Sequence, residues 1–427
     1  MFFKVKNISF FLEAKFFEKL IFLLPISLIL GNLAINLNIF LIIISFIFEE
    51  KDQLNIKFIK NKNQLIILVL IATFFLINII NSSDIFLSTK GVLGVLKYAL
   101  FFLILTIFFK KKDNFKYLSL IFFTSLNFIL IDTIIQFVFG TDIFGYTREL
   151  KIGSDLTSSR LSGPFGDELV VGGFLKNIFL ISMLWFLFSN KNNNIFFFYL
   201  IITMVVILLS GERASSIMFL FFCFLFIFFF NFSIKKKIIF FLTLVFTFLI
   251  FFSVNENLRK SAFDRTFKQL GIIKPDISYK GHKNFFDSQW GAHYLTAYEI
   301  YKDNKLIGSG IKSFRVECAN TKYDKINSVR SNSRCATHPH NIYLEILSET
   351  GLVGSFLFIF IIAFIIKTQL KNLSSTKTDL YSFHFGILIV FLTLIWPVQT
   401  TGSFFSTFNG FFYWFYAALI FSKQNYS

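Results

Sequence analysis

The stretch that decides the fold of this chain reads CATHPHNIYLEILSETG and covers residues 335–351. It joins the longest polar segment of the chain to a hydrophobic run. His338 and His340 lie here on either side of a proline, and Glu345 and Glu349 follow just inside the apolar run. Titratable side chains are costly inside a membrane, so their position at this border predicts a functional site.

The composition around this stretch is that of a membrane protein. Of the 427 residues, 55% are hydrophobic, which soluble domains do not show, and apolar runs long enough to cross a bilayer recur along almost the whole chain. The formal net charge of +17 could indicate nucleic acid binding. In a membrane protein it is more typical of basic loops that face the cytoplasm. We therefore expect a lipid bilayer, and no nucleic acid, as a partner.

Lysine clusters between the apolar runs predict the topology. They put both termini and alternate loops on the cytoplasmic side, which gives about 12 transmembrane helices. The fold class is thus an all-α integral membrane protein. The expected spans are 20–33, 35–48, 64–80, 92–109, 117–139, 169–189, 195–210, 214–231, 238–253, 342–366, 380–396 and 404–421.

Two outer segments interrupt these spans. Residues 1–253 hold helices 1–9 and include a polar outer loop at 140–168. Residues 254–340 form a larger outer domain between helices 9 and 10, and apolar and aromatic residues at spacings of three to four predict that it is mostly helical. Residues 341–427 hold helices 10–12 and a cytoplasmic tail.

All eight arginines of the chain fall on the predicted outer side, whereas the inner loops carry only lysine. The planar guanidinium group suits bidentate contact with phosphates and carboxylates. Arg213 follows Glu212 in a turn between two spans, where it either binds a phosphate at membrane level or forms a self-neutralising pair with the glutamate. Arg160 precedes a turn rich in glycine and proline that could direct it back over the bundle.

The two histidines precede a helix face that carries polar groups. Asn341 is suited to cap this helix, and Asn341, Glu345 and Glu349 share one face at spacings of four. That face should point into the bundle or into a wet cavity. A neutral histidine at the mouth of the helix is a natural general base, although two histidines could also simply cap it.

Cysteine usage leaves two readings open. Cys318 and Cys335 lie in the large outer segment, and either form a disulfide that clamps the approach to His338 or remain free thiols. No Cys-x-x-Cys or His-x-x-x-His spacing occurs, so we expect no metal.

The segment HNIYLEILSETGLVG, residues 340–354, resembles a signature of the bacterial O-antigen ligase and Wzy-type O-antigen polymerase superfamily, in which a His-Asn pair precedes Glu-x-Gly-x-x-Gly. Residues 308–314 resemble the Gly-x-Gly…Phe element upstream. Residues 210–213 resemble the Ser/Thr-Gly-Ser-Arg turn, with Glu212 in place of the usual small residue, and residues 160–165 resemble an outer-loop element. The resemblance covers roughly residues 140–410.

This resemblance implies a GT-C-like glycosyltransferase of the bacterial inner membrane with its active site facing the periplasm. Such an enzyme uses no metal or cofactor and takes its glycan from undecaprenyl pyrophosphate. His340 would be the base that deprotonates the acceptor hydroxyl. Arg160, Arg213 and Arg265 would bind the donor pyrophosphate, and His338 would orient His340 or hold the turn.

Several alternatives stay open at this point. Arg259 or Arg315 could replace Arg265, because the outer segment aligns loosely. A ligase transfers the glycan to lipid A–core, a polymerase to another lipid-linked glycan, and a related branch to proteins; the compact tail and single large outer loop favour the ligase slightly. A transporter would carry ionisable groups and Gly/Pro breaks in mid-span, and a non-catalytic scaffold would not need the clustered His, Glu and Arg.

Overall fold

The computed structural model describes residues 6–50, 62–147, 160–189, 193–229, 233–254, 265–269, 272–273, 284–375 and 378–422. Within these residues the chain is helical, and β-structure is limited to isolated bridges such as that between Thr141 and Thr147. The expected α-helical fold class is therefore confirmed for the described part of the chain.

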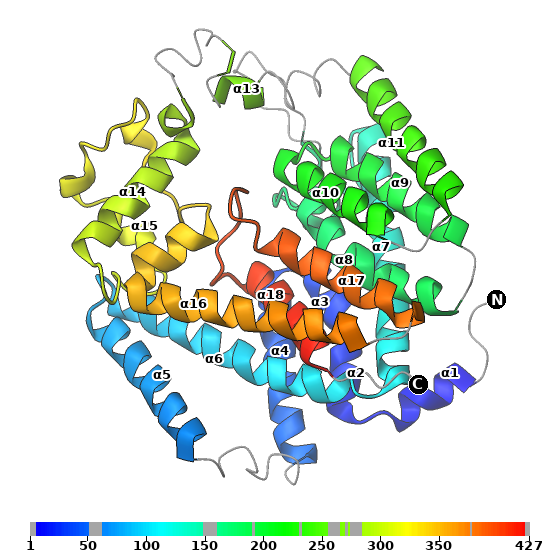
Figure 1. Cartoon of the computed structure of the whole chain (residues 1–427), viewed down its shortest axis with the longest axis horizontal. Coiled ribbons are helices and arrows are strands. Elements are labelled where there is room, and N and C mark those ends of the chain that lie inside the picture. The colour runs from blue at the N-terminus through cyan, green and yellow to red at the C-terminus, as the bar shows by residue number, and fades with distance from the viewer. Residues whose placement is uncertain are drawn as a thin grey trace.

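The helices follow one another in the order labelled in Figure 1. The first part holds α1 (Lys6–Glu13), α2 (Phe16–Phe22), α3 (Leu24–Leu30), α4 (Asn32–Glu49), α5 (Lys62–Ile80), α6 (Ile85–Phe108) and α7 (Lys112–Phe139). The middle part holds α8 (Val171–Ser189), α9 (Asn193–Leu209), α10 (Arg213–Phe229) and α11 (Ile234–Val254). The last part holds α13 (Arg265–Gln269), α14 (Gln289–Asp303), α15 (Phe314–Glu317), α16 (Ile342–Ser375), α17 (Thr378–Leu394) and α18 (Thr407–Phe421).

Apart from the first, each apolar run expected as a span coincides largely with one helix within the described residues. The first run, 20–33, is not one helix, because α2 ends at Phe22 and α3 starts at Leu24. Pro25 lies in the first turn of α3, where its missing N–H is tolerated, whereas within a continuous helix it would break the hydrogen-bond ladder.

Four of the described helices are long and apolar enough to cross a membrane. They are Asn32–Glu49, Ile85–Phe108, Lys112–Phe139 and Ile342–Ser374, and five shorter apolar helices accompany them. The protein is therefore a membrane protein. The total of about 12 spans, the GT-C-like layout and the domain boundaries stay predictions.

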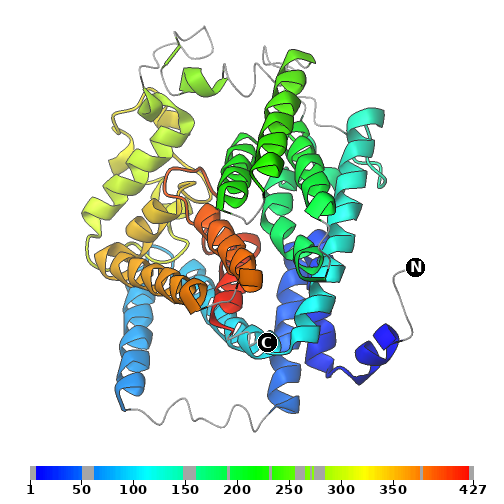
Figure 2. The ribbon, with the colours of Figure 1, turned by 45° about the vertical axis from the view of Figure 1, so that its right-hand side comes forward.

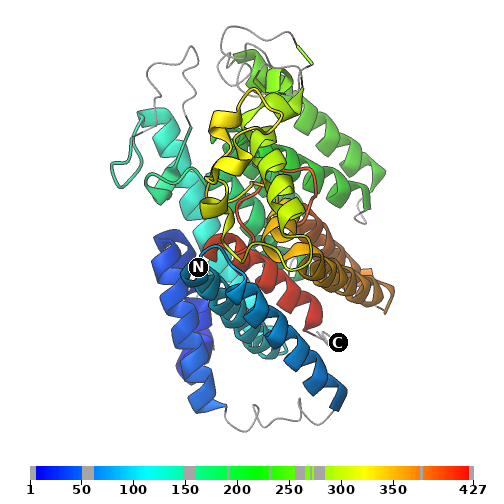
Figure 3. The same cartoon turned by 90° about the vertical axis from the view of Figure 1, so that its left-hand side faces the viewer.

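The last three long helices lie at the centre of the arrangement. α16 contacts α14 on one side, and α17 contacts α8 and α10 on the other, while α18 packs against α6 (Figure 1). The end of α4 and the start of α5 lie at one end of the molecule, and α13 lies at the opposite end (Figures 2 and 3). A large aromatic core joins the helices, and a second, small core of Ala297, Ile300, Phe314, Cys318 and Tyr323 holds α14 and α15 together.

The glycine of the Glu-x-Gly-x-x-Gly segment interrupts α16. Gly351 has φ 65° and ψ −164°, a conformation open essentially to glycine alone. A Cβ atom here would also collide with the backbone of Leu306. The break leaves two backbone amides without a partner inside the helix, and both donate hydrogen bonds to another segment. Leu352 N donates to Lys305 O at 2.8 Å, and Val353 N donates to Leu306 O at 3.1 Å. The break in α16 is thereby fixed to residues 305 and 306, in the segment that precedes the histidines.

Candidate active site

The turn that carries the histidines ends at the cap of α16. The Asn341 side-chain oxygen accepts hydrogen bonds from Tyr343 N at 3.0 Å and Leu344 N at 3.1 Å, which satisfies two free amides of the first turn. Its amide group donates to Pro397 O at 2.7 Å. Asn341 therefore joins the start of α16 to the loop between α17 and α18.

His340 lies directly before this cap in an unusual backbone conformation. Its φ is 59°, and Lys312 at 63° is the one other non-glycine residue with positive φ in the described part of the chain. Such conformations cluster at functional sites, because they persist only where the surroundings impose them. The His340 carbonyl accepts a hydrogen bond from Thr401 N at 2.9 Å, which holds the strained turn.

Three aromatic rings surround the imidazole of His340. The ring of His338 lies 4.1 Å away, that of Trp290 4.6 Å away, and that of His293 5.3 Å away in a stacked arrangement. His338 is held from both sides, since Thr337 Oγ1 lies 2.9 Å from its Nδ1 and Thr401 O lies 3.1 Å from its Nε2. His338 and His340 therefore form one group with α14.

Both histidines of the turn are neutral near pH 7. Burial lowers the pKa of His340 to about 3, and the neighbouring His338 and His293 add to the effect. Burial likewise lowers the pKa of His338 to about 4, against the hydrogen bond to Thr401. A neutral imidazole keeps one nitrogen free to accept a proton, as a general base requires.

His293 is a member of this group that sequence reasoning missed. It lies on α14 with 0% of its surface exposed, and neither ring nitrogen makes a well-formed hydrogen bond within the described residues, although the Ser333 backbone lies near. A buried polar group without a partner is costly. The sequence does indicate His293, because it is a polar residue three positions after Trp290 on the apolar face of the helix predicted within 285–301.

The two glutamates of α16 hold loops. Glu345 accepts hydrogen bonds from the Ser403 hydroxyl and from Phe404 N at 2.7 Å. Glu349 accepts from Lys312 N at 2.6 Å and Phe314 N at 3.1 Å. Both side chains are buried. Their shared face thus points inward, where it positions the two loops on either side of the histidine turn.

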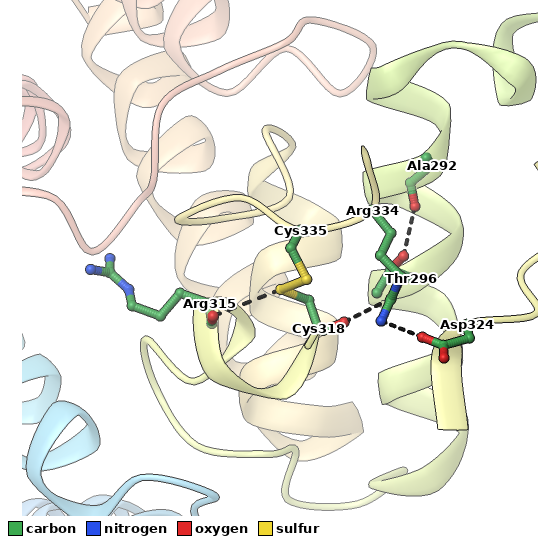
Figure 4. The surroundings of a disulfide bond; sticks show 7 residues. All are labelled: Ala292, Thr296, Arg315, Cys318, Asp324, Arg334 and Cys335. Carbon is green, nitrogen blue, oxygen red and sulfur yellow. Dashed lines mark hydrogen bonds and ion pairs between the residues drawn. A yellow bond between two sulfur atoms is a disulfide. The ribbon is translucent and has the colours of Figure 1, made fainter. Parts of the chain in front are cut away.

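A disulfide fixes the segment before the histidines. Cys318 at the end of α15 is bonded to Cys335, with Cα atoms 5.3 Å apart (Figure 4). Arg334 adds a second tie, since its Nε donates to Cys318 O at 3.0 Å and its guanidinium group pairs with Asp324. Arg315 extends away from this cross-link in Figure 4. Of the two interpretations of these cysteines, the structure therefore shows the disulfide.

A second group of polar residues surrounds the N-terminal end of α8. Glu212 accepts hydrogen bonds from Gly172 N at 2.6 Å and Gly173 N at 3.1 Å, in the first turn of that helix. A carboxylate is favoured there by the free amides and by the helix dipole. Burial raises the pKa of Glu212, which the charge of Arg160 opposes. This explains how a glutamate can stand where the related turn has a small residue.

Arg160 borders the same helix end. Its Nη2 donates to Leu169 O at 3.2 Å, whereas its Nε is buried and has no hydrogen-bond partner within the described residues. Leu161 N donates to Ser210 O at 3.3 Å, which ties the residue after Arg160 to the turn before Arg213. The structure therefore brings together the two arginine turns that are far apart in sequence.

Arg213 begins α10 and points to the third arginine segment. Its Nη1 donates to Thr266 Oγ1 at 2.9 Å, which places α13 beside it. Arg265 is the first residue of α13, and its side chain lies outside the described part of the chain, as do Arg148 and Arg259 entirely. The backbone of Arg265 thus lies next to the Arg213 contact.

The loop at 395–406 contacts both the histidine group and α10, the helix that Arg213 begins. Thr401 contacts both histidines, and Trp396 packs its ring 4.9 Å from that of Phe221 on α10. Within the described ranges, no three His, Cys, Asp or Glu side chains are placed so that they could hold a metal ion. The arrangement can accept a proton at the histidines and bind an anion at the arginines.

These features define an all-helical membrane protein with a buried histidine site and an arginine site at helix ends. Residues 198–359 match the family model described as O-antigen ligase. The match confirms, over these residues, the resemblance to the O-antigen ligase and Wzy-type polymerase superfamily. It covers Arg213, Arg265 and the whole histidine turn, while Arg160 precedes it.

The family match has a functional consequence at a coarse level. It supports a role in surface polysaccharide biosynthesis, by a glycosyltransferase-like enzyme acting on lipid-linked glycans in a membrane. No curated protein matches the chain significantly.

Proposed function

We propose that this protein transfers a glycan from undecaprenyl pyrophosphate to lipid A–core at the periplasmic face of the bacterial inner membrane, as an O-antigen ligase. The observation that carries the proposal is the neutral His340 on a strained turn, held by Asn341 and Thr401 at the outer end of α16. The family match over residues 198–359 supports the substrate class.

The proposed reaction is a single displacement that inverts the anomeric centre and needs no metal. His340 takes the proton of the acceptor hydroxyl as the oxygen attacks the anomeric carbon of the donor. The bond from that carbon to the pyrophosphate oxygen breaks, and undecaprenyl pyrophosphate leaves with the electron pair. Arg160, Arg213 and Arg265 stabilise the negative charge that develops on it.

The buried Nε of Arg160 supports the donor site. Its Nε–H has no partner within the described residues, and an unsatisfied buried donor costs roughly 1–3 kcal/mol. A pyrophosphate oxygen would remove that cost and would add a charge-assisted hydrogen bond. Glu212 does not bond to this Nε among the described residues, and its oxygens accept hydrogen bonds from the first turn of α8.

The donor also adjusts the base. A histidine with a pKa of about 3 holds a proton weakly, and proton transfer is most efficient when the pKa of the base lies near the working pH. A bound pyrophosphate places negative charge near the site, which raises the pKa of His340. The histidine is therefore a stronger base when the donor is bound.

The test uses purified protein in nanodiscs with a glycan on undecaprenyl pyrophosphate as donor. His340→Asn should lower kcat about 10²–10⁴-fold, the usual contribution of a general base, while asparagine accepts the positive φ. Lys325→Gln, on an exposed lysine of the same outer segment, is the control and should leave kcat unchanged. Undiminished transfer by His340→Asn would sink the assignment of the base.

The acceptor is decided in the same assay by comparing lipid A–core with a second lipid-linked glycan. Product on lipid A–core supports the ligase, and chain extension of the lipid-linked glycan identifies a polymerase. Movement of the glycan across a sealed vesicle without any new glycosidic bond would indicate the transporter instead.

A further inference from the structure

A second set of basic side chains lies where α6 meets the loop at 308–315. Ile311 packs against Gly91 of α6 so closely that a Cβ atom at Gly91 would overlap its side chain. This contact sets Lys312, the next residue, beside α6. On the same helix, the Tyr98 hydroxyl donates to Thr407 O at 2.5 Å, which brings the start of α18 next to Lys97.

Lys97 is an ionisable residue inside an apolar helix. It lies within α6, one of the helices able to cross a membrane, where such a residue marks a functional site by default. Its ammonium group donates to the Asn36 side chain and lies 4.3 Å from the centre of the Tyr98 ring. No carboxylate of the described residues lies within ion-pair distance of it.

Lys312 and Arg315 extend this positive charge toward the histidines. Lys312 is within electrostatic reach of Lys97, and burial followed by the charge of Arg315 lowers the pKa of Lys312. The charge of Arg315 also acts on His338. Like charges gathered in this way oppose one another, so the arrangement costs free energy unless an anion joins it.

Two nearby carboxylates attract Lys312 without pairing with it. The oxygens of Glu345 and Glu349 accept hydrogen bonds from loop amides and a hydroxyl. Neither forms an ion pair with Lys312 or Arg315 among the described contacts. In addition, Lys312 keeps a φ of 63°, a position that glycine would fill more cheaply.

We propose that Lys97, Lys312 and Arg315 form a phosphate-binding site for the lipid-anchored acceptor, separate from the arginines that bind the donor. The proposal rests on the proposed transferase function. An acceptor anchored in the membrane carries its phosphate near the membrane surface, as a pyrophosphate in a lipid-linked glycan or as a phosphate on a glycolipid. Binding it here would direct the acceptor sugar toward the histidine group.

Kinetics with both substrates varied test the assignment. Arg315→Gln is the first variant, because Arg315 is exposed and its change is least disruptive; Lys312→Gln and Lys97→Gln follow. Each should raise the KM for the acceptor about tenfold or more, the effect of one charge-assisted hydrogen bond, and leave the KM for the donor within about twofold. Lys325→Gln removes the same charge from the outer segment and should change neither KM.

A change in donor KM by the same factor as acceptor KM, or no change in acceptor KM for any of the three variants, would overturn the proposal. Thermal unfolding of each variant separates lost binding from lost folding. If Lys97→Gln fails to fold, Arg315→Gln alone still decides the outcome.

A binding measurement keeps this site distinguishable from the proposed reaction. Native mass spectrometry would count the undecaprenyl pyrophosphate molecules bound to the wild type and to Arg315→Gln. The same measurement would compare the binding of lipid A with that of lipid A lacking its phosphates, on both proteins. Two undecaprenyl pyrophosphates on the wild type and one on the variant assign the site to a lipid-linked acceptor. Phosphate-dependent lipid A binding that the variant loses assigns it to a glycolipid. If the variant binds both probes like the wild type, the site is refuted whether or not transfer occurs.

Discussion

Acidification should destabilise this protein through the histidine group. Folding lowers the pKa of His338 to about 4 and that of His340 to about 3, from about 6.5 in an unfolded chain. Between these values the unfolded chain binds protons that the folded protein refuses. The stabilising contribution is therefore complete above about pH 6.5 and is lost as the pH falls toward 3–4.

For each histidine, the free energy of unfolding falls by about 1.4 kcal/mol for each pH unit below 6.5. At pH 5 each of the two histidines costs about 2 kcal/mol of stability relative to pH 7.5. His340→Asn removes one of these sites without introducing a charge. The variant should therefore lose about 2 kcal/mol less than the wild type between pH 7.5 and pH 5, which corresponds to a few degrees in the midpoint of thermal unfolding.

The assay is thermal unfolding in detergent, followed by intrinsic fluorescence at both pH values. The comparison of the two proteins cancels the contribution of titrating groups outside the histidine group. Equal losses of midpoint temperature in wild type and variant would refute a depressed pKa at His340. A greater loss in the variant would mean that His340 is stabilised in its charged form.

Three further predictions concern the loops and the cross-link. Glu349→Gln turns one acceptor oxygen into a donor that faces a backbone amide, and should cost about 1–3 kcal/mol in thermal unfolding, while Glu299→Gln on the exposed face of α14 shifts the midpoint far less. Cys318→Ser should lower the free energy of unfolding by about 3 kcal/mol relative to the oxidised wild type, and should leave it unchanged relative to the wild type reduced with dithiothreitol. The same difference between variant and wild type in dithiothreitol would contradict a stabilising role for the disulfide. Gly351→Ala should cost more than about 2 kcal/mol, whereas Gly94→Ala, which has open space in α6, should be neutral or stabilising; similar midpoints for the two would refute the break in α16.

The positions of the long helices could be predicted from the sequence because apolar runs dominate it. The ends of these helices could be predicted less well. α6 starts at Ile85 and not near residue 92, since Asp84 caps it by accepting a bond from Leu87 N at 2.9 Å and the helix tolerates Lys90 before the apolar run. Hydropathy alone does not register such a cap.

The local part of the site could also be predicted. The cap at Asn341 and the inward face of α16 follow from spacing, because both depend on residues within a few turns of each other. His293 and Lys97 stand out among apolar neighbours, but their place in the site could not be predicted from spacing. They reach the site through tertiary packing of α14 and α6, and nothing in the residues beside them indicates the partner.

The disulfide has a consequence for the order in which the protein matures. Cys335 stands three residues before His338, so the bond to Cys318 anchors the chain directly ahead of the histidine turn. Disulfides form in oxidising compartments. If the outer segment is periplasmic as proposed, the chain is inserted into the membrane first, and its histidine turn receives this anchor only after export. A cell that lacks thiol oxidation outside the cytoplasm would then accumulate inserted but immature protein, which links polysaccharide assembly to the oxidative folding of its own transferase.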